Sequence, residues 1–161
     1  MKIEDYGFIG NTLSGAIVGI NGSIDWLALP RFDSEACFAA LLGHHANGHW
    51  QICPAKPAQS ATQCYRGNTL VLETLFKMVD AELKVTDFMP MQLGAPTVVR
   101  VVESVHGAVD VVMHLTIRFS YGLAVPWVRQ IKGGITAVAG PDALVLRSDV
   151  EIRGEKKTCR A

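Results

Sequence analysis

Residues Asn21–Leu42 read NGSIDWLALPRFDSEACFAALL, and this stretch decides the fold of the chain around it. Asn21-Gly22 is a dipeptide that supplies the positive φ angles of a tight hairpin turn. We therefore expect a strand that ends at Ile20 to pair with a strand that contains Ile24. Because Pro30 has no backbone N–H, the second strand is predicted to end there or to lie at a sheet edge.

The loop that follows this strand carries the candidates for ligand contact: Trp26, Arg31, Phe32 and Asp33. Sugars are bound by aromatic rings against their apolar faces and by planar charged groups at their hydroxyls. An arginine and an aspartate separated by one aromatic residue supply both kinds of contact. The structural alternative is that Arg31 and Asp33 pair with each other or with the backbone to fix the loop, while Trp26 and Phe32 belong to the core.

A short helix is predicted near residues 35–42, directly after the loop. Asp33 or Ser34 can cap its first turn, and Gly43 is suited to end it. Asp33 and Glu35 point in diverging directions across such a helix start. They are therefore not expected to work as a catalytic pair, since glycoside hydrolysis needs two carboxyls on opposite sides of one bond. No catalytic residue is assigned to this chain.

The remaining sequence is mostly typical of β-structure. In residues 81–89, Glu82 and Lys84 alternate with Leu83 and Val85, which is the pattern of a half-buried strand. Further strands are expected within residues 6–20 (two strands), 49–53, 70–78, 97–105, 109–119, 128–131, 135–138 and 143–147. Residues 43–65 otherwise read as loop. Short strands separated by Gly- and Pro-marked turns predict a mainly β fold, an antiparallel β-sandwich.

Composition restricts the class of protein. The chain has 161 residues, of which 49% are hydrophobic and 19% charged, so we expect one globular domain over 1–161. Lys plus Arg and Asp plus Glu both number 15, which favours neither a nucleic acid nor an anionic membrane as partner. No secretory leader is recognisable at the N-terminus, and we expect a cytoplasmic protein.

No cofactor or metal is predicted. The 4 cysteines, at positions 37, 53, 64 and 159, are expected to be reduced thiols, although a Cys53–Cys64 disulfide is conceivable. His44, His45 and His49 suggest a metal cluster at first. Adjacent histidines in a loop rich in Gly, Ala and Asn are more often solvent-exposed turn residues, which is the expectation here.

Several separate motifs, in the same order along the chain, resemble bacterial glycoside hydrolase family 15 proteins, the glucoamylase-like and trehalase-like group. The motifs are Ile3–Val18 (IEDYGFIGNTLSGAIV), Gly22–Ser34 (GSIDWLALPRFDS), Gly48–Trp50, Tyr65–Thr74 (YRGNTLVLET) and Val85–Pro90 (VTDFMP). In the last motif, Asp87 is expected to bond loop amides and to hold a corner. The resemblance extends from Ile3 to about Gly122, which is most of the chain.

The resemblance implies a trehalase-like N-terminal β-sandwich domain that is not itself catalytic. In that family the sandwich precedes an (α/α)6 barrel that carries the catalytic carboxylates, and this chain stops at Ala161, before any such barrel. The expected partners are therefore that catalytic domain and an α-glucoside at the domain boundary. We expect the sandwich to be cut at its C-terminal edge. The alternative is a stand-alone carbohydrate- or partner-binding module that forms homo-oligomers through an open sheet edge.

Overall fold

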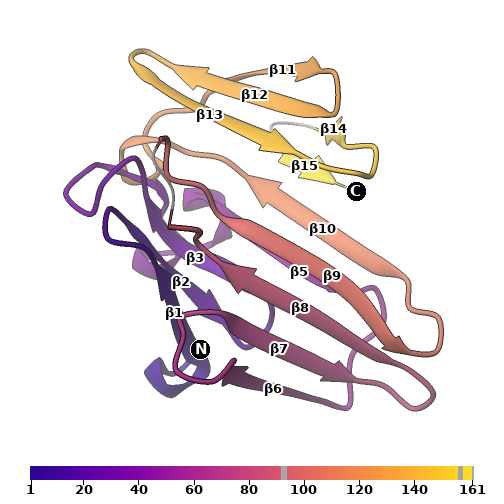
Figure 1. The fold of residues 1–161 in the computed structure, drawn as a ribbon. Coiled ribbons are helices and arrows are strands. Elements are labelled where there is room, and N and C mark those ends of the chain that lie inside the picture. The colour runs from indigo at the N-terminus through magenta and orange to yellow at the C-terminus, as the bar shows by residue number, and fades with distance from the viewer. Residues whose placement is uncertain (92–93, 156–157, 161) are drawn as a thin grey trace.

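The structure, a computed structural model, describes residues 1–91, 94–155 and 158–160 (Figure 1). Within these ranges the chain forms three antiparallel sheets of 8, 4 and 3 strands, accompanied by short 3-10 turns. The described part contains no helix with the length and apolar character needed to cross a membrane. The mainly β, antiparallel fold predicted from the sequence is confirmed.

The largest sheet has the strand order β1-β2-β3-β5-β10-β15-β14, with β4 paired to β3. Its strands are β1 (Tyr6–Gly10), β2 (Gly15–Gly19), β3 (Ser23–Ala28), β4 (Ala36–Phe38), β5 (His49–Pro54), β10 (Val111–Thr116), β14 (Arg153–Glu155) and β15 (Thr158–Arg160). The four-stranded sheet contains β6 (Ser60–Tyr65), β7 (Leu72–Lys77), β8 (Glu82–Phe88) and β9 (Val99–His106). The three-stranded sheet contains β11 (Trp127–Ile131), β12 (Gly134–Ala139) and β13 (Asp142–Arg147). The 3-10 turns are η1 (Ile3–Asp5), η2 (Ala40–Leu42), η3 (His45–Asn47) and η4 (Ser120–Gly122).

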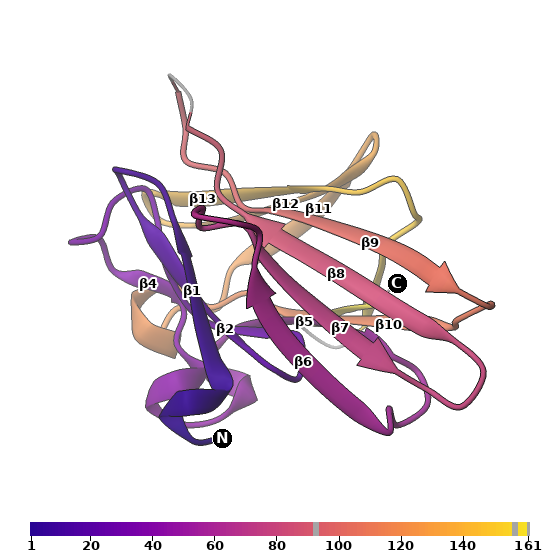
Figure 2. The same cartoon turned by 60° about the horizontal axis from the view of Figure 1, so that its bottom comes forward.

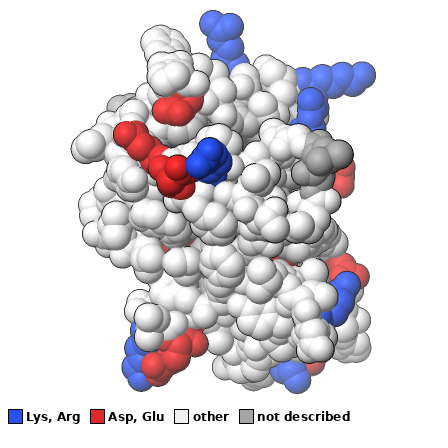
Figure 3. Space-filling view, turned by 60° about the vertical axis from the view of Figure 1, so that its left-hand side comes forward, with Lys and Arg blue, Asp and Glu red and all other residues white. Residues whose placement is uncertain are grey.

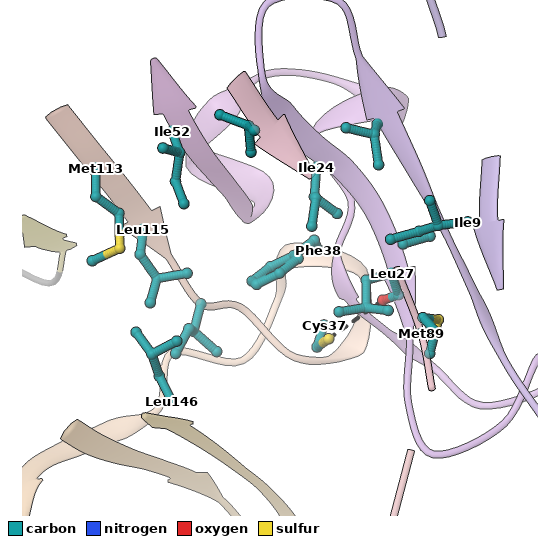
Figure 4. Close-up of a cluster of buried hydrophobic side chains, with 14 of the residues drawn as sticks. Ile9, Ile24, Leu27, Cys37, Phe38, Ile52, Met89, Met113, Leu115 and Leu146 are labelled. Atoms are coloured by element: carbon teal, nitrogen blue, oxygen red, sulfur yellow. Dashed lines mark hydrogen bonds between the residues drawn. The ribbon is translucent and has the colours of Figure 1, made fainter. Parts of the chain in front are cut away.

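The largest sheet and the four-stranded sheet face each other as the two layers of a sandwich (Figure 2). One core is built from both layers, with Ile24 and Leu115 from the largest sheet and Val85 from the four-stranded sheet. The three-stranded sheet adds Leu146 to the same core, close to Leu115 in Figure 4. Each fully buried side chain of this size stabilises the fold by about 1.5–3 kcal/mol, so this shared core holds the three sheets together.

The hairpin predicted at Asn21-Gly22 is present between β2 and β3. Gly22 has a φ of 78°, and its N–H donates a hydrogen bond of 2.8 Å to the carbonyl of Gly19. A Cβ atom at position 22 would lie 2.1 Å from the carbonyl oxygen of Ile52. Glycine is therefore required at this position both by the backbone angle and by the close approach of β5.

The helix predicted near residues 35–42 is reduced to the three-residue 3-10 turn η2, and the residues before it form strand β4. Phe38 pairs with Leu27 of β3, and its side chain is 1% exposed. The backbone of Ala39 and Ala40 then donates to the carbonyl of Gly48, at 3.1 and 3.0 Å. These long-range hydrogen bonds replace the hydrogen bonds of a helix. The burial of Phe38 in the core outweighs the helix propensity of the local sequence.

Residues 43–65 contain one strand more than the sequence indicated. Strand β5 was expected, but β6 lies in a stretch that was predicted to be loop. Its sequence SATQCY is polar, and most of its side chains are exposed or half-buried. It forms a strand because it pairs along its whole length with β7 at an edge of the four-stranded sheet.

A buried ion pair joins the two layers of the sandwich. The side chains of Arg100 and Asp87 are 1% and 0% exposed, and the Arg100 Nε–H donates to Asp87 Oδ1 at 2.8 Å. The same guanidinium donates to the carbonyl oxygens of Trp50 (2.6 Å) and Gly22 (2.7 Å) in the opposite layer, and it lies 5.1 Å from the centre of the Trp50 ring. Asp87 was predicted to hold a corner through loop amides; it has the structural role, but its partner is an arginine.

Breaking this pair is expected to destabilise the fold strongly. Replacing Arg100→Met keeps most of the aliphatic stem but leaves the Asp87 carboxylate buried without its partner. We expect the free energy of unfolding to fall by about 3–5 kcal/mol, measured by urea denaturation. The control is Lys84→Met, which breaks the Lys84–Glu103 pair, whose side chains are 26% and 49% exposed. That variant should lose less than about 1 kcal/mol, and equal losses in the two variants would contradict this role for Arg100.

The described cysteine side chains are free thiols that differ in burial. Cys37, Cys53 and Cys64 are not joined in disulfides, so the conceivable Cys53–Cys64 bridge is absent. The Cys37 thiol donates to the Leu27 carbonyl at 3.4 Å (Figure 4), and burial raises its pKa to about 12. Cys64 is exposed. The side chain of Cys159 lies outside the described part of the chain.

Thiol labelling at pH 8 should therefore be selective. A thiolate-directed reagent is expected to modify Cys64 in the folded protein while Cys37 stays protected, because the buried thiol is protonated and inaccessible. Fragmentation of the tryptic peptide 32–66, which contains the three cysteines, in a tandem mass spectrometer gives the modified position. Adding denaturant should make Cys37 react as fast as Cys64. Rapid labelling of Cys37 in the native protein would contradict the packing of β4 into the core.

Candidate functional site

The candidate loop, residues 29–34, leaves the end of β3 and presents a charged pair at its tip. The Arg31 guanidinium donates two hydrogen bonds to the Asp33 carboxylate, Nε–H to Oδ1 at 2.9 Å and an Nη2–H to Oδ2 at 3.0 Å. The two side chains are 68% and 71% exposed, and Phe32 between them is 57% exposed. The loop therefore offers an arginine, an aromatic ring and a carboxylate directly to solvent.

A backbone hydrogen bond holds this loop against the neighbouring turn between β1 and β2. The N–H of Phe32 donates to the carbonyl of Leu13 at 3.0 Å, and Ser34 closes the loop by exchanging bonds of 3.1 Å with Arg31. The turn itself is fixed by Asn11, whose side-chain oxygen accepts the N–H groups of residues 13 and 14, both at 2.9 Å. The base of the loop is thus ordered while its three tip side chains remain accessible.

Trp26 lies on β3, apart from the loop tip. Its ring is half-buried, and its ring partner is Tyr121 of η4, at 6.0 Å between centroids. The structure therefore brings Arg31, Phe32 and Asp33 together and places Trp26 in a different contact. The alternative reading of the sequence is correct for the Arg31–Asp33 pair and wrong for Phe32, which is outside the core.

The electrostatic character of the tip follows from its exposure. An ion pair in water contributes about 0–1 kcal/mol, so the Arg31–Asp33 pair exchanges its partners for other polar groups at little cost. The sequence carries no net charge. Most of the surface shown in Figure 3 is uncharged, with a few separate Lys, Arg, Asp and Glu side chains. The tip is therefore suited to neutral ligands that accept and donate hydrogen bonds rather than to strongly charged ones.

A second polar cluster, which the sequence analysis missed, surrounds Asp25 in the middle of β3. Asp25 is 4% exposed, and its two carboxylate oxygens accept the hydroxyls of Tyr6 (2.9 Å) and Ser23 (2.5 Å). Burial and the bond to Asp25 raise the pKa of Tyr6 to about 12. The bond from Tyr6 crosses β2 and ties β1 to β3. The signal in the sequence was a single acidic residue inside an apolar strand, between Ile24 and Trp26.

The histidines near η3 form a structural contact. The rings of His45 and His49 stack with centroids 4.4 Å apart, and Nδ1 of His49 bonds the carbonyl of His45 at 2.9 Å. His49 is 6% exposed and its ring is held against His45 of η3, so the expectation of solvent-exposed turn residues is wrong for it. Among the described residues no group of three His, Cys, Asp or Glu is placed to hold a metal ion.

Comparison with known proteins gives a consistent group of relatives. The sequence model of the trehalase-like N-terminal family matches residues 1–158. A trehalase of Thermoplasma volcanium is 32% identical over 158 residues, covering 94% of this chain and 25% of the relative. Trehalase 1 of Sulfolobus acidocaldarius is 36% identical over 152 residues, covering 93% of this chain and 26% of the relative. A trehalase of Mycolicibacterium smegmatis is 30% identical over 138 residues, covering 74% of this chain and 20% of the relative.

These relatives are much longer than this chain, which spans about a quarter of the length of the first two. No solved structure gives a significant match. The sequence similarity therefore concerns the domain described here and leaves most of each relative outside the comparison.

Burial of His49 makes stability depend on pH. Desolvation lowers its pKa, an effect that His45 and His114 increase, while the His45 carbonyl and Asp25 act in the opposite direction. Below about pH 6.5 the unfolded chain binds a proton at this position more readily than the folded chain does, so stability falls as the pH decreases. We expect His49→Gln to flatten the decrease in melting temperature between about pH 7 and 5.

The matched control for this measurement is His106→Gln, which changes an exposed histidine at the end of β9. It should leave the pH profile of the melting temperature unchanged. A parent-like profile for the His49 variant would show that other groups cause the pH dependence.

Proposed function

The chain belongs to the trehalase-like N-terminal family, and from this membership we propose that it is the non-catalytic N-terminal domain of a glycoside hydrolase acting on α-glucosides. In this proposal the parent enzyme is of the glycoside hydrolase family 15, glucoamylase- and trehalase-like type. The domain supports an (α/α)6 catalytic barrel and contributes a loop to the substrate pocket. The cytoplasmic location expected from the sequence stays a prediction.

The observation that carries this proposal is the ordered base and exposed tip of loop 29–34. Exposed charged pairs are ordinarily mobile surface features, but here the backbone is held by Leu13 and Ser34. A fixed loop pays little conformational entropy when it meets a ligand or a second domain. Its tip therefore suits a pocket that is completed across a domain boundary.

The chemistry of the tip fits a sugar. Arg31 donates in-plane N–H bonds that hydroxyl oxygens accept, and the Asp33 carboxylate accepts from hydroxyl groups. The ring of Phe32, 57% exposed, can cover the apolar C–H face of a pyranose. Asp33 remains a binding group in this proposal rather than a catalytic one, because it is open to solvent and occupied by Arg31.

The second candidate function is a stand-alone carbohydrate- or partner-binding module. It is favoured by the exposed aromatic side chains of Phe32 (57%) and Trp127 (83%), whose rings are available to a ligand. Titration of this chain alone with maltose and trehalose separates the two functions. Saturable binding by the isolated chain supports the module, whereas binding that requires the rest of the polypeptide supports the hydrolase domain.

The first proposal predicts a kinetic effect of Arg31→Ala in a complete enzyme. A suitable protein is a chimaera in which this chain replaces the matching residues of the Thermoplasma volcanium trehalase. Loss of the guanidinium removes hydrogen bonds to substrate, so we expect kcat/KM for trehalose to fall about tenfold, which corresponds to about 1.4 kcal/mol. Initial-rate kinetics provide the measurement.

The control is Lys77→Ala, which breaks the exposed Lys77–Glu82 pair in the β7–β8 hairpin (Figure 1). It should leave kcat/KM unchanged. If Arg31→Ala also leaves both kcat and KM at the parent values, the loop does not contribute to the substrate pocket.

A further inference from the structure

Strand β9 forms one edge of the four-stranded sheet, whose order is β6-β7-β8-β9. With 8 residues, Val99–His106, it is the longest strand in the described part of the chain. Its sequence VRVVESVH is rich in valine, which favours strand pairing. A long apolar edge strand is a template on which another extended segment pairs, and folded proteins usually protect such edges.

The valines of β9 are exposed on both of its faces. Arg100 points toward the opposite layer, so Val102 shares that inner face by alternation. Val102 is nevertheless 40% exposed, whereas its partner on β8, Val85, is 0% exposed. On the outer face, Val101 is 42% exposed. The inner face of the sheet is therefore covered at β8 and exposed to solvent at β9.

The backbone of β9 is paired on one side alone. In residues 1–91, 94–155 and 158–160, its ladder bonds go to β8, and no backbone-to-backbone bond joins it to another element. Strand β1, at the edge of the opposite layer, has some of its outward backbone groups occupied by a side chain. At β1, the Tyr65 hydroxyl accepts the N–H of Phe8 (2.8 Å) and donates to its carbonyl (3.0 Å), which occupies both edge groups of that residue.

The other edge of the four-stranded sheet is also protected, by composition. Strand β6 carries Ser60, Thr62 and Gln63, whose polar side chains make it a poor template for an apolar strand. Strand β9 combines unpaired backbone groups with exposed apolar side chains over the greatest strand length in the described part of the chain. That combination is the requirement for binding by strand addition, in which backbone bonds give affinity and alternate side chains give specificity.

We propose that the free edge of β9 receives an extended segment from the polypeptide that follows this domain in the complete hydrolase, an inference that rests on the proposed function. The segment adds a strand beside β9 and places alternate apolar side chains over Val102. The occupant is assigned to the same polypeptide because the relatives are about four times as long as the matched region, which the family places at the N-terminus.

The position of β15 agrees with this assignment. It is the last strand along the chain, it pairs with β10, and β10 follows β9 after the turn at Gly107. Figure 1 shows β15 beside β10. On the outer face of β9, Glu103 is already paired with Lys84 at 3.0 Å, so the added strand needs no charge to match it.

Hydrogen–deuterium exchange tests the proposal. The amides of residues 99–106 are compared between this chain alone and the chimaera with the Thermoplasma volcanium trehalase. We expect the edge-facing amides of β9 to exchange at least about 100-fold more slowly in the chimaera, because an added strand would hydrogen-bond them. The amides of β6 provide the internal control and should keep their rates. Unchanged β9 rates in a folded chimaera would overturn the proposal.

A pair of substitutions gives an independent test. Val102→Lys places a charge on the inner face of β9 where the added strand would pack, and Thr62→Lys places the same charge on β6. In the chimaera, Val102→Lys should abolish the extra protection of β9, and Thr62→Lys should keep it. Equal effects of the two variants would overturn the proposal.

The remaining outcomes distinguish the occupant and the proposed function. If this chain alone forms a dimer by sedimentation, and Val102→Lys makes it monomeric, the occupant is a second copy and the assignment is wrong. A folded chimaera that protects β9 but does not hydrolyse trehalose contradicts the proposed function and keeps this inference. If the chimaera does not fold, the complete Thermoplasma volcanium trehalase and its own N-terminal quarter provide the same comparison, at the strand that matches residues 99–106.

Discussion

The buried ion pair between Arg100 and Asp87 is the contact on which the two facing sheets depend. Its charges come from neighbouring strands of one layer, but the guanidinium also binds the carbonyls of Trp50 and Gly22 in the other layer. A buried charge is tolerated when its partner and its remaining hydrogen bonds are in place. Because two of the acceptors are backbone atoms, the pair fixes the spacing and alignment of the strands themselves.

The position of the candidate loop follows from this alignment. The Gly22 carbonyl accepts from Arg100 and also from the N–H of Ile52, at 3.1 Å, so the β2–β3 turn is held from two directions. Strand β3 leaves that turn, contains the register shift near Asp25 and ends at Ala28. The loop then starts from a strand whose register is determined at its far end, which explains how a short exposed segment keeps a defined place.

Local signals predicted a large part of the fold. The Asn-Gly turn, the alternation in residues 81–89 and the position of the charged loop were evident from the sequence. Strands β4 and β6 were not, because they exist through pairing with β3 and β7 rather than through their own propensity. The partners of Arg100 were also beyond prediction, since Trp50 and Gly22 lie 50 and 78 positions away in the sequence.

The ion pair also gives the open edge a definite geometry. Arg100 belongs to β9, the strand whose outer side is unpaired, and its bonds to the opposite layer fix which side chains of β9 face inward. A strand that is free to slip offers alternative registers to any segment that approaches it. Since β9 is anchored through Arg100, it presents one register and one pattern of side chains. The contact that holds the sandwich together therefore also sets the surface on which it can be extended.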